Sequence, residues 1–265
     1  QDWSIHGTTG YEFCRLINGL FIDPEAQTML SRTYRAFTRT QTDFDELVYR
    51  CKHQIMKHAM ASELNVLAGQ LSHICEMRPH TRDFTTNHLR HALTEVIAHL
   101  PVYRTYIRDG HVAELDRRYV EWAVAIAKKR AQTQDTSIFD FISNVLLLDA
   151  AKNADASYHA AITAFAMKFQ QVSSPVMAKG CEDTAFYLYH RLISLNEVGS
   201  DPRHFGTSVK AFHAENLKRL EHWPHAMLNT STHDSKRSED VRMRINVLSE
   251  IPEQWNQQVR RWRRL

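Results

Sequence analysis

Glycine and proline are both scarce in this chain of 265 residues, which holds only 8 glycines and 7 prolines. β-Sandwiches and complete α/β barrels are built with many turns, and turns consume glycine. The composition therefore predicts a mainly helical chain. Hydrophobic residues make up 43% and charged residues 24%, which are ordinary values for globular proteins and exclude disorder and low complexity.

Other features are missing as well. No run of 18 apolar residues exists, so we expect no membrane partner. The formal net charge of +3 is far below the clustered charge of a dedicated nucleic-acid binder. The chain has no initiator methionine and no signal pattern, and we expect it to be a piece of a longer protein. No CxxC pair occurs, so we expect free thiols and a cytoplasmic location. The cysteines are Cys14, Cys51, Cys75 and Cys181.

The glycines divide the chain into a middle and two flanks. Between Leu20 and Lys179 only Gly69 and Gly110 occur. This middle shows apolar residues every three or four positions, which is the pattern of amphipathic helices. Helices are predicted over residues 43–74, 86–100, 115–127, 137–148 and 154–169, with Asp43, Thr86 and Ser137 as N-caps.

The flank after the middle has a different pattern. Residues 171–178 and 226–230 are short, partly β-branched and bounded by turn residues, which predicts two strands. Helices are predicted over residues 185–193, 207–221 and 238–249, and from Pro252, whose fixed φ suits a first helical position.

Two polar clusters carry aromatic residues. Residues 7–13 (Gly-Thr-Thr-Gly-Tyr-Glu-Phe) form either a functional loop or a turn before a helix. Residues 179–184 (Lys-Gly-Cys-Glu-Asp-Thr) precede Phe186, Tyr187 and Tyr189. Aromatic faces beside hydrogen-bonding carboxylates suit a sugar ring. The alternative is a solvated helix cap, because acidic residues favour a first helical turn.

Residues 230–240 (Thr-Ser-Thr-His-Asp-Ser-Lys-Arg-Ser-Glu-Asp) form a third cluster, with six ionisable residues. A carboxylate flanked by His, Lys and Arg is held ionised by its positive neighbours, which favours a functional site over a capping loop. The basic run at residues 260–264 is interpreted as a solvated helix end. No metal site is predicted, since His53 and His58 are five residues apart and do not share a helical face.

At these clusters the sequence resembles the maltooligosyltrehalose synthase family, in glycoside hydrolase family 13 of the α-amylase superfamily. The resemblance covers essentially the whole chain. Its motifs are residues 7–13, 18–23, 47–53, 101–106, 175–187, 195–199 and 230–242. The departures from the family pattern at Ser174, Cys181 and Ser235 remove no charged group.

The resemblance implies an isomerase of trehalose biosynthesis. The family converts the reducing-end α-1,4 linkage of a maltooligosaccharide into an α,α-1,1 linkage by intramolecular transglycosylation, without cofactor or metal. A partner hydrolase then releases trehalose. The implied scaffold is a (β/α)8 barrel with its site at the carboxyl ends of the strands. The family's nucleophilic Asp and acidic Glu precede the motif at residues 7–13, so the resemblance implies that this chain alone is inactive.

For the motif at residues 230–242, the resemblance implies roles for four residues. Asp234 is the catalytic carboxylate that steadies the positive charge of the transition state. His233 hydrogen-bonds the same glucose, and Lys236 and Arg237 help to close the pocket.

For the remaining motifs, the implied roles are in substrate binding. Lys179, Glu182 and Asp183 hold the glucose that leaves, turns over and is attacked again. Tyr11 lines the pocket from the side of the fifth barrel strand.

The predicted fold is therefore mainly α, with a helical insertion domain and a partial barrel. Residues 1–20 are expected to be loop and turn after strand five, residues 21–170 the insertion domain, and residues 171–265 the barrel segment from strand six to helix seven. The alternative is a free-standing helical module that binds a protein or a glucan without catalysis.

Overall fold

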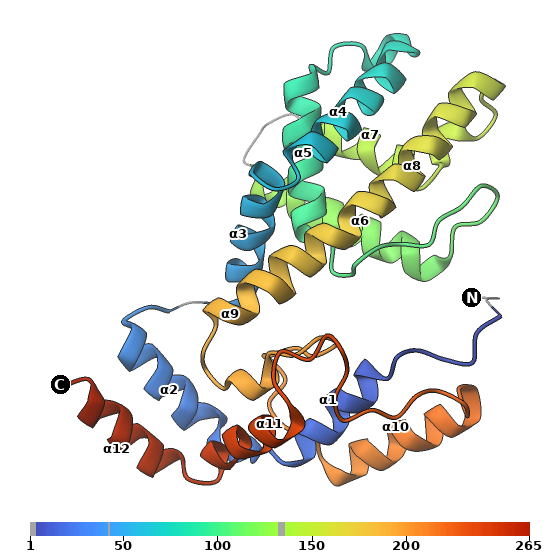
Figure 1. Cartoon of the computed structure of the whole chain (residues 1–265). Helices are drawn as coiled ribbons and strands as arrows, with labels where there is room; N and C mark the ends of the chain where they lie inside the picture. The colour runs from blue at the N-terminus through green and yellow to red at the C-terminus, as the bar shows by residue number, and fades with distance from the viewer. Residues whose placement is uncertain (1–3, 42, 132–135) are drawn as a thin grey trace. The chain divides into compact units, whose positions relative to one another are not determined.

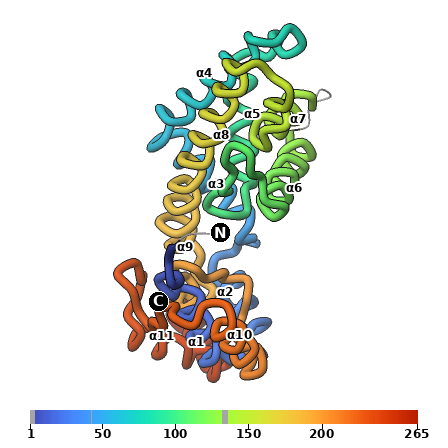
Figure 2. Tube along the Cα trace, turned by 90° about the vertical axis from the view of Figure 1, so that its right-hand side faces the viewer, coloured from blue at the N-terminus to red at the C-terminus, as the bar shows by residue number. Residues whose placement is uncertain are grey.

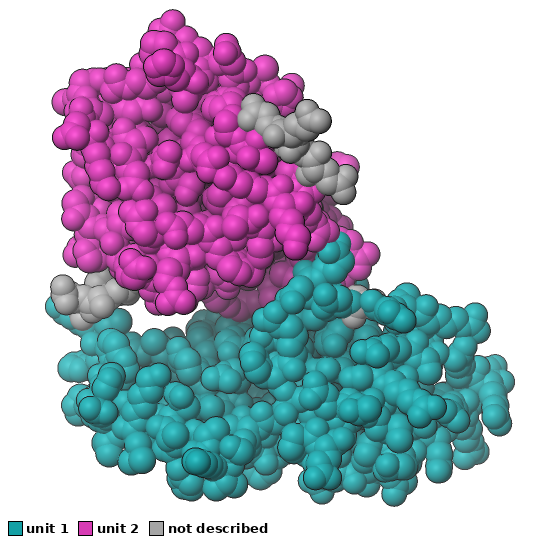
Figure 3. Space-filling model, turned by 180° about the vertical axis from the view of Figure 1, so that it is seen from behind, with its two compact units in different colours: residues 1–46, 185–265 teal, residues 47–184 magenta. Residues whose placement is uncertain are grey.

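Two compact units make up the chain in the computed structural model, which describes residues 4–41, 43–131 and 136–265. One unit comprises residues 47–184, and the other combines residues 1–46 with 185–265 (Figure 3). Helices cover well over half of the described residues, which contain no β-strand. The prediction of a mainly α chain is confirmed.

Residues 47–184 form a helical unit (Figures 1 and 2). Its apolar core is continuous across the helices, and side chains such as Leu67, Leu93 and Phe165 are fully buried in it. The helices are α3 (Phe44–Lys57), which begins just before the unit, α4 (Ala61–Glu76), α5 (Thr86–His99), α6 (Glu114–Arg130), α7 (Ser137–Leu146) and α8 (Ala156–Met177).

The predicted helix over residues 43–74 is two helices, α3 and α4. The chain turns at His58, Ala59 and Met60, where the backbone N–H of Met60 bonds the carbonyl of Ile55. The apolar spacing continues across the turn, so periodicity did not show it. Asp43 does cap α3, because its Oδ1 accepts from the N–H of Asp45 at 3.3 Å.

The other predicted caps are displaced by one residue. Thr85, not Thr86, is the N-cap of α5, and its hydroxyl accepts from the N–H of His88. Thr136, not Ser137, precedes α7. In both cases the N-cap is a threonine next to the predicted residue, and Thr85 makes a side-chain cap bond whereas Thr136 makes none.

The strand predicted at residues 171–178 is wrong. Residues 171–177 end α8, and a π-helix, Ala178–Ala185, follows. Val172 and Val176 are both buried, and their spacing of four places them on one helical face. Pro175 lies inside the helix, where it was interpreted as a strand boundary.

The unit of residues 1–46 and 185–265 has a small apolar core that includes Leu30, Leu195 and Phe205. Much of the rest of its interior is polar, with Asn196, Glu197 and Arg242 buried. Its α-helices are α1 (Tyr11–Leu20), α2 (Gln27–Thr38), α9 (Phe186–Leu188), α10 (Val209–His222), α11 (Glu239–Asn246) and α12 (Pro252–Trp262).

Helix α1 lies within residues 1–20, which the predicted domain division assigns to loop and turn. Gly10 adopts a left-handed conformation with φ 90°, and the helix begins at the next residue. The structure therefore agrees with the turn-before-a-helix interpretation of residues 7–13. Helix α2 was missed, whereas α12 begins at Pro252 as predicted.

The strand predicted at residues 226–230 is also wrong. This segment has no strand partner among the described residues and is held by single contacts instead. The side-chain amide of Asn229 donates to the carbonyl of Thr9, and a Cβ on Gly10 would lie 2.4 Å from the carbonyl oxygen of Met227. Only glycine permits this close approach of two backbones.

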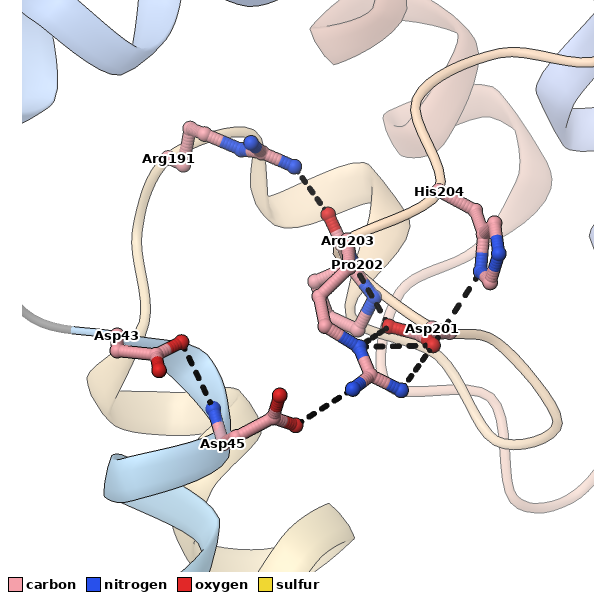
Figure 4. A network of polar contacts seen from close by, with 7 residues as sticks. All are labelled: Asp43, Asp45, Arg191, Asp201, Pro202, Arg203 and His204. Carbon is pink, nitrogen blue, oxygen red and sulfur yellow. Dashed lines mark hydrogen bonds and ion pairs between the residues drawn. The ribbon is translucent and has the colours of Figure 1, made fainter.

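Charged side chains tie the loop at residues 200–205 to the start of α3 within the same unit (Figure 4). Arg203 bonds Asp201 with two nitrogens and Asp45 with a third, and His204 contacts Asp201 at 3.2 Å. Arg191 donates to the carbonyl of Pro202. Burial alone would raise the pKa of Asp201, but the hydrogen bonds from Arg203 outweigh it and lower this pKa.

The helices of the described residues include none that combines the length and apolar character of a membrane span. No group of three His, Cys, Asp or Glu side chains in the same residues could hold a metal ion. None of the four cysteines, all of which lie in the described part of the chain, forms a disulfide.

Candidate functional site

Three of the predicted site residues meet at one carboxylate oxygen. The hydroxyl of Tyr11, the first residue of α1, donates to Oδ2 of Asp234 at 2.7 Å. Nε2 of His233 lies 3.3 Å from the same oxygen. The side chain of Asp234 is 51% exposed, so the carboxylate can reach a ligand from solvent.

Short hydroxyl side chains shape the loop that presents Asp234. The hydroxyl of Thr232 accepts from the N–H of Asp234 at 3.2 Å. The hydroxyl of Ser235 accepts from the N–H of Thr232 at 2.9 Å. Such side-chain-to-backbone bonds stabilise turns. Ser235, a departure from the family pattern, makes this bond with its hydroxyl, a group that threonine also carries.

Glu197 anchors the other side of this loop. Its Oε2 accepts from the N–H of Lys236 at 2.6 Å, and its Oε1 accepts from the N–H of Arg237 at 2.8 Å. The residue is 4% exposed. Burial raises the pKa of the Glu197 carboxyl, an effect that the two backbone hydrogen bonds and Arg242 partly offset.

Arg242 lies beneath the same loop and is 1% exposed. Its Nη1 donates to the carbonyl of Arg237 at 2.7 Å, and its Nη2 donates to the carbonyl of Thr230. The thiol of Cys14 donates to the same Thr230 carbonyl at 3.3 Å. Burial raises the pKa of this thiol. The guanidinium therefore ties both ends of the loop to α11.

Neither Glu197 nor Arg242 was singled out as a site residue. Both lie in motifs that carry the resemblance, at residues 195–199 and 230–242, but charge and motif membership did not show that they face inward. A lone acid at position 197 and an arginine four residues into a polar helix are ordinarily solvated. They are identified as supports of the loop only by the structure, in which both side chains are buried and bond the loop backbone.

Lys236 and Arg237 differ in what their side chains contact. Nζ of Lys236 lies 5.7 Å from the ring centre of Tyr187, which is half exposed. Nη1 of Arg237 lies 3.4 Å from the carbonyl of Ile193. Lys236 is thus beside an aromatic face open to solvent, whereas Arg237 bonds the backbone of its own unit.

The other predicted site residues lie on the π-helix at the end of the unit of residues 47–184. Nζ of Lys179 and Oδ2 of Asp183 form an ion pair at 2.7 Å, with both side chains well exposed. Glu182 is buried and accepts from the hydroxyl of Tyr103. The hydroxyl of Thr184 bonds the carbonyl of Lys179 five residues back. Such π-helical turns are rare and frequently occur at functional sites.

Lys52 supports this π-helix from α3. A Cβ on Gly180 would lie 2.8 Å from Cγ of Lys52, so the lysine stem packs against the glycine. Nζ of Lys52 donates to the carbonyl of Leu100 at 2.9 Å, and the residue is 3% exposed. Burial lowers the pKa of Lys52 from 10.5 to about 8.

Lys52 makes stability depend on pH in a predictable direction. Between pH 8 and pH 10.5 the unfolded lysine binds a proton that the folded lysine has lost, so the free energy of unfolding rises with pH in this window. We expect a gain of about 2 kcal/mol between pH 8 and pH 10 that Lys52→Met removes. Urea unfolding of both proteins at the two pH values measures it. The exposed Lys129→Met is the control, and parallel pH profiles for wild type and Lys52→Met would contradict the prediction.

The eight predicted residues fall into two groups, one in each compact unit. Asp234, His233, Tyr11, Lys236 and Arg237 belong to the unit of residues 1–46 and 185–265, while Lys179, Glu182 and Asp183 belong to the other. In the first group Tyr11, His233 and Asp234 meet at one oxygen, and in the second Lys179 and Asp183 form an ion pair. Their substrate contacts stay predictions.

The chain is similar to known proteins over nearly its whole length. A putative maltooligosyl trehalose synthase of Mycobacterium tuberculosis is 32% identical over 251 residues, which is 95% of this chain and 29% of that protein. The structure of maltooligosyltrehalose synthase from Arthrobacter ramosus superposes with a TM-score of 0.79 at 34% identity, covering 96% of this chain and 30% of the other. A hypothetical maltooligosyl trehalose synthase of Sulfolobus tokodaii gives a TM-score of 0.71 at 32% identity, covering 99% and 30%.

No model of a known protein family matches the chain. The chain spans about 30% of the length of the relatives it matches. The resemblance inferred from the motifs is confirmed, and nothing in these comparisons favours the free-standing binding module.

Proposed function

We propose that this chain, a homologue of a portion of the maltooligosyltrehalose synthases, serves the reaction for which those proteins are named. The reaction moves the reducing-end glucose of a maltooligosaccharide from an α-1,4 to an α,α-1,1 linkage by intramolecular transglycosylation. One observation carries the proposal: Tyr11, His233 and Asp234, from two motifs more than 200 residues apart, meet at one oxygen. Supporting it is the match over 95% of the chain.

In the proposed mechanism, Asp234 stabilises the positive charge that develops at the anomeric carbon. A fixed carboxylate helps this transition state more than the neutral substrate. The Tyr11 hydroxyl holds one oxygen of Asp234 in place, and His233 hydrogen-bonds the sugar at its side. Because Glu197 and Arg242 fix the loop before the substrate arrives, little reorganisation is needed during the reaction.

Lys179, Glu182 and Asp183 are proposed to hold the glucose that is released and attacked again. The exposed ion pair of Lys179 and Asp183 offers a donor and an acceptor that match sugar hydroxyls. Tyr103 bonds Glu182 and fixes the direction of its carboxylate. Tyr187 beside Lys236 supplies an aromatic face for stacking.

Two carboxylates that the family needs, a nucleophilic Asp and an acidic Glu, have no counterpart in the motifs of this chain. We therefore expect no conversion of maltopentaose by the 265-residue chain by itself. The complete protein in which it occurs is expected to produce a non-reducing isomer of equal mass. Chromatography with a reducing-sugar assay measures both. Conversion by the isolated chain would show that the nucleophile and acid are wrongly assigned, and a complete protein without mutase activity would overturn the proposed function.

The organisation of the protein and its setting are also proposed. We retain residues 21–170 as a helical insertion domain and residues 171–265 as part of a (β/α)8 barrel of glycoside hydrolase family 13. The compactness of residues 47–184 supports a separate helical domain.

Four described cysteines that form no disulfide support a reducing, cytoplasmic location. The product is proposed to pass to a trehalose-releasing hydrolase.

A further inference from the structure

An open cavity of about 440 Å³ lies in the unit of residues 47–184, and none of the residues assigned to catalysis lines it. Its walls come from the end of α3, the first turns of α4, and α5. A cavity of this size is typical of small-molecule sites. It holds none of the predicted substrate-binding residues, so the proposed function does not account for it.

The lining of the cavity is basic. Lys57, Arg90, His53, His58 and His91 all contribute to it, and it contains no Asp or Glu. Lysine and arginine carry permanent charge near neutral pH. The three histidine rings add further hydrogen-bonding nitrogens.

No nearby carboxylate neutralises the two permanent charges. Lys57 and Arg90 form no ion pair with a carboxylate of the described residues. The positions one helical turn away, Thr86, Thr94 and Ala61 among them, carry no acid. The buried acid of this region, Glu95, is already bound by His53 at 3.1 Å and by the Tyr49 hydroxyl at 3.0 Å. The cavity therefore keeps an uncompensated positive charge.

The start of α4 adds to the positive electrostatic potential of the cavity. The N-cap of α4, Met60, makes no side-chain cap bond, and Ala61, the first residue of α4, lines the cavity. Uncapped N–H groups at a helix start favour a negative charge. The cationic side chains and the helix end thus act in the same direction.

Other ligand classes fit less well. A metal ion is disfavoured because the described residues contain no group of three metal-binding side chains in reach of each other. A neutral glucan is disfavoured because the lining contains no Phe, Tyr or Trp on which a sugar ring could stack. The cavity is much larger than one phosphate ion. Gln54, Asn87 and Thr94 offer hydrogen bonds to neutral hydroxyls beside the charge.

We propose that this cavity binds a phosphorylated molecule of monosaccharide size, with its phosphate held by Lys57 and Arg90. The phosphate is a dianion that accepts several charge-assisted hydrogen bonds, which are the strong ones in proteins. The sugar portion occupies the polar remainder of the cavity. None of the carboxylates proposed to act on the glucan lines this cavity.

Isothermal titration calorimetry of the complete protein with glucose 6-phosphate, inorganic phosphate and glucose tests the proposal. We expect glucose 6-phosphate to bind more tightly than inorganic phosphate, and glucose not to bind this site. The double variant Lys57→Gln, Arg90→Gln is expected to weaken glucose 6-phosphate binding at least tenfold. The matched control Arg118→Gln, Lys129→Gln removes two exposed charges of the same unit and is expected to leave it unchanged.

Both replaced side chains are exposed, so we expect α3 and α5 to remain folded in the double variant. Circular dichroism checks this. Unchanged glucose 6-phosphate affinity in the folded double variant overturns the proposal, as does equal loss in the control. Equal binding of glucose and glucose 6-phosphate indicates a neutral sugar site and also overturns it. Mutase activity is measured separately, so a failed mutase assay and a failed phosphate titration are distinguishable.

Discussion

Asp234→Asn in the complete enzyme is expected to lower kcat by at least about a hundredfold, the scale of one electrostatic stabiliser of a transition state, while thermal unfolding stays unchanged. The reason is charge. Asparagine keeps the size of aspartate and one oxygen that can accept from Tyr11, which bonds Asp234 at 2.7 Å, but it removes the negative charge that opposes the developing cation.

The same substitution separates catalysis from capping. Asparagine caps helices and turns about as well as aspartate, so a purely structural Asp234 predicts near-normal rates and near-normal melting. Asp240→Asn is the matched control, because Asp240 is an exposed carboxylate in the first turn of α11. Steady-state kinetics with maltopentaose and calorimetry measure both effects. Retention of more than about a tenth of the wild-type rate by Asp234→Asn would show that this residue is wrongly assigned.

Arg242→Met is expected to have the largest effect on stability, with a loss of about 3–5 kcal/mol, the usual cost of removing one partner of a buried ionic network. The methionine cannot donate to the carbonyls of Arg237 and Thr230, which both lose a guanidinium donor, although Thr230 keeps the thiol of Cys14. Glu197 also loses the positive charge that lowers the pKa of its carboxyl against the effect of burial.

Chemical denaturation of the complete protein measures this loss. Arg244→Met is the matched control, since Arg244 is exposed on the same helix and is expected to change stability by less than about 0.5 kcal/mol. We also expect the mutase rate of Arg242→Met to fall, because the loop that carries Asp234 loses its support. Equal stability of the two variants would exclude the anchoring role of Arg242.

Helix prediction succeeded where local chemistry decides the structure. The apolar spacing in residues 86–100 and 115–127 identified α5 and α6, because each buries one face in the same core. Pro252 marked the start of α12, since its fixed φ suits a first helical position. These features depend on residues within a few turns of each other.

Prediction failed where distant packing decides the structure. Residues 171–177 have the β-branched composition of a strand, but burial of Val172 and Val176 in the helical core keeps them in α8. In the π-helix that follows, Gly180 packs closely against Lys52, which lies 128 positions earlier in the chain. A local sequence pattern cannot predict a contact between residues so far apart in the chain.

The sequence by itself determined the mainly helical class, through scarce glycine and periodic apolar residues, and the resemblance to maltooligosyltrehalose synthases, through long polar motifs in order. It also singled out Tyr11, His233 and Asp234 as site residues. Only the tertiary structure decided that these three share one oxygen, and that Glu197 and Arg242 hold the loop beneath them. The physical reason is burial: whether a charged side chain is solvated or supports a site depends on the elements that fold over it, and those come from opposite ends of the chain.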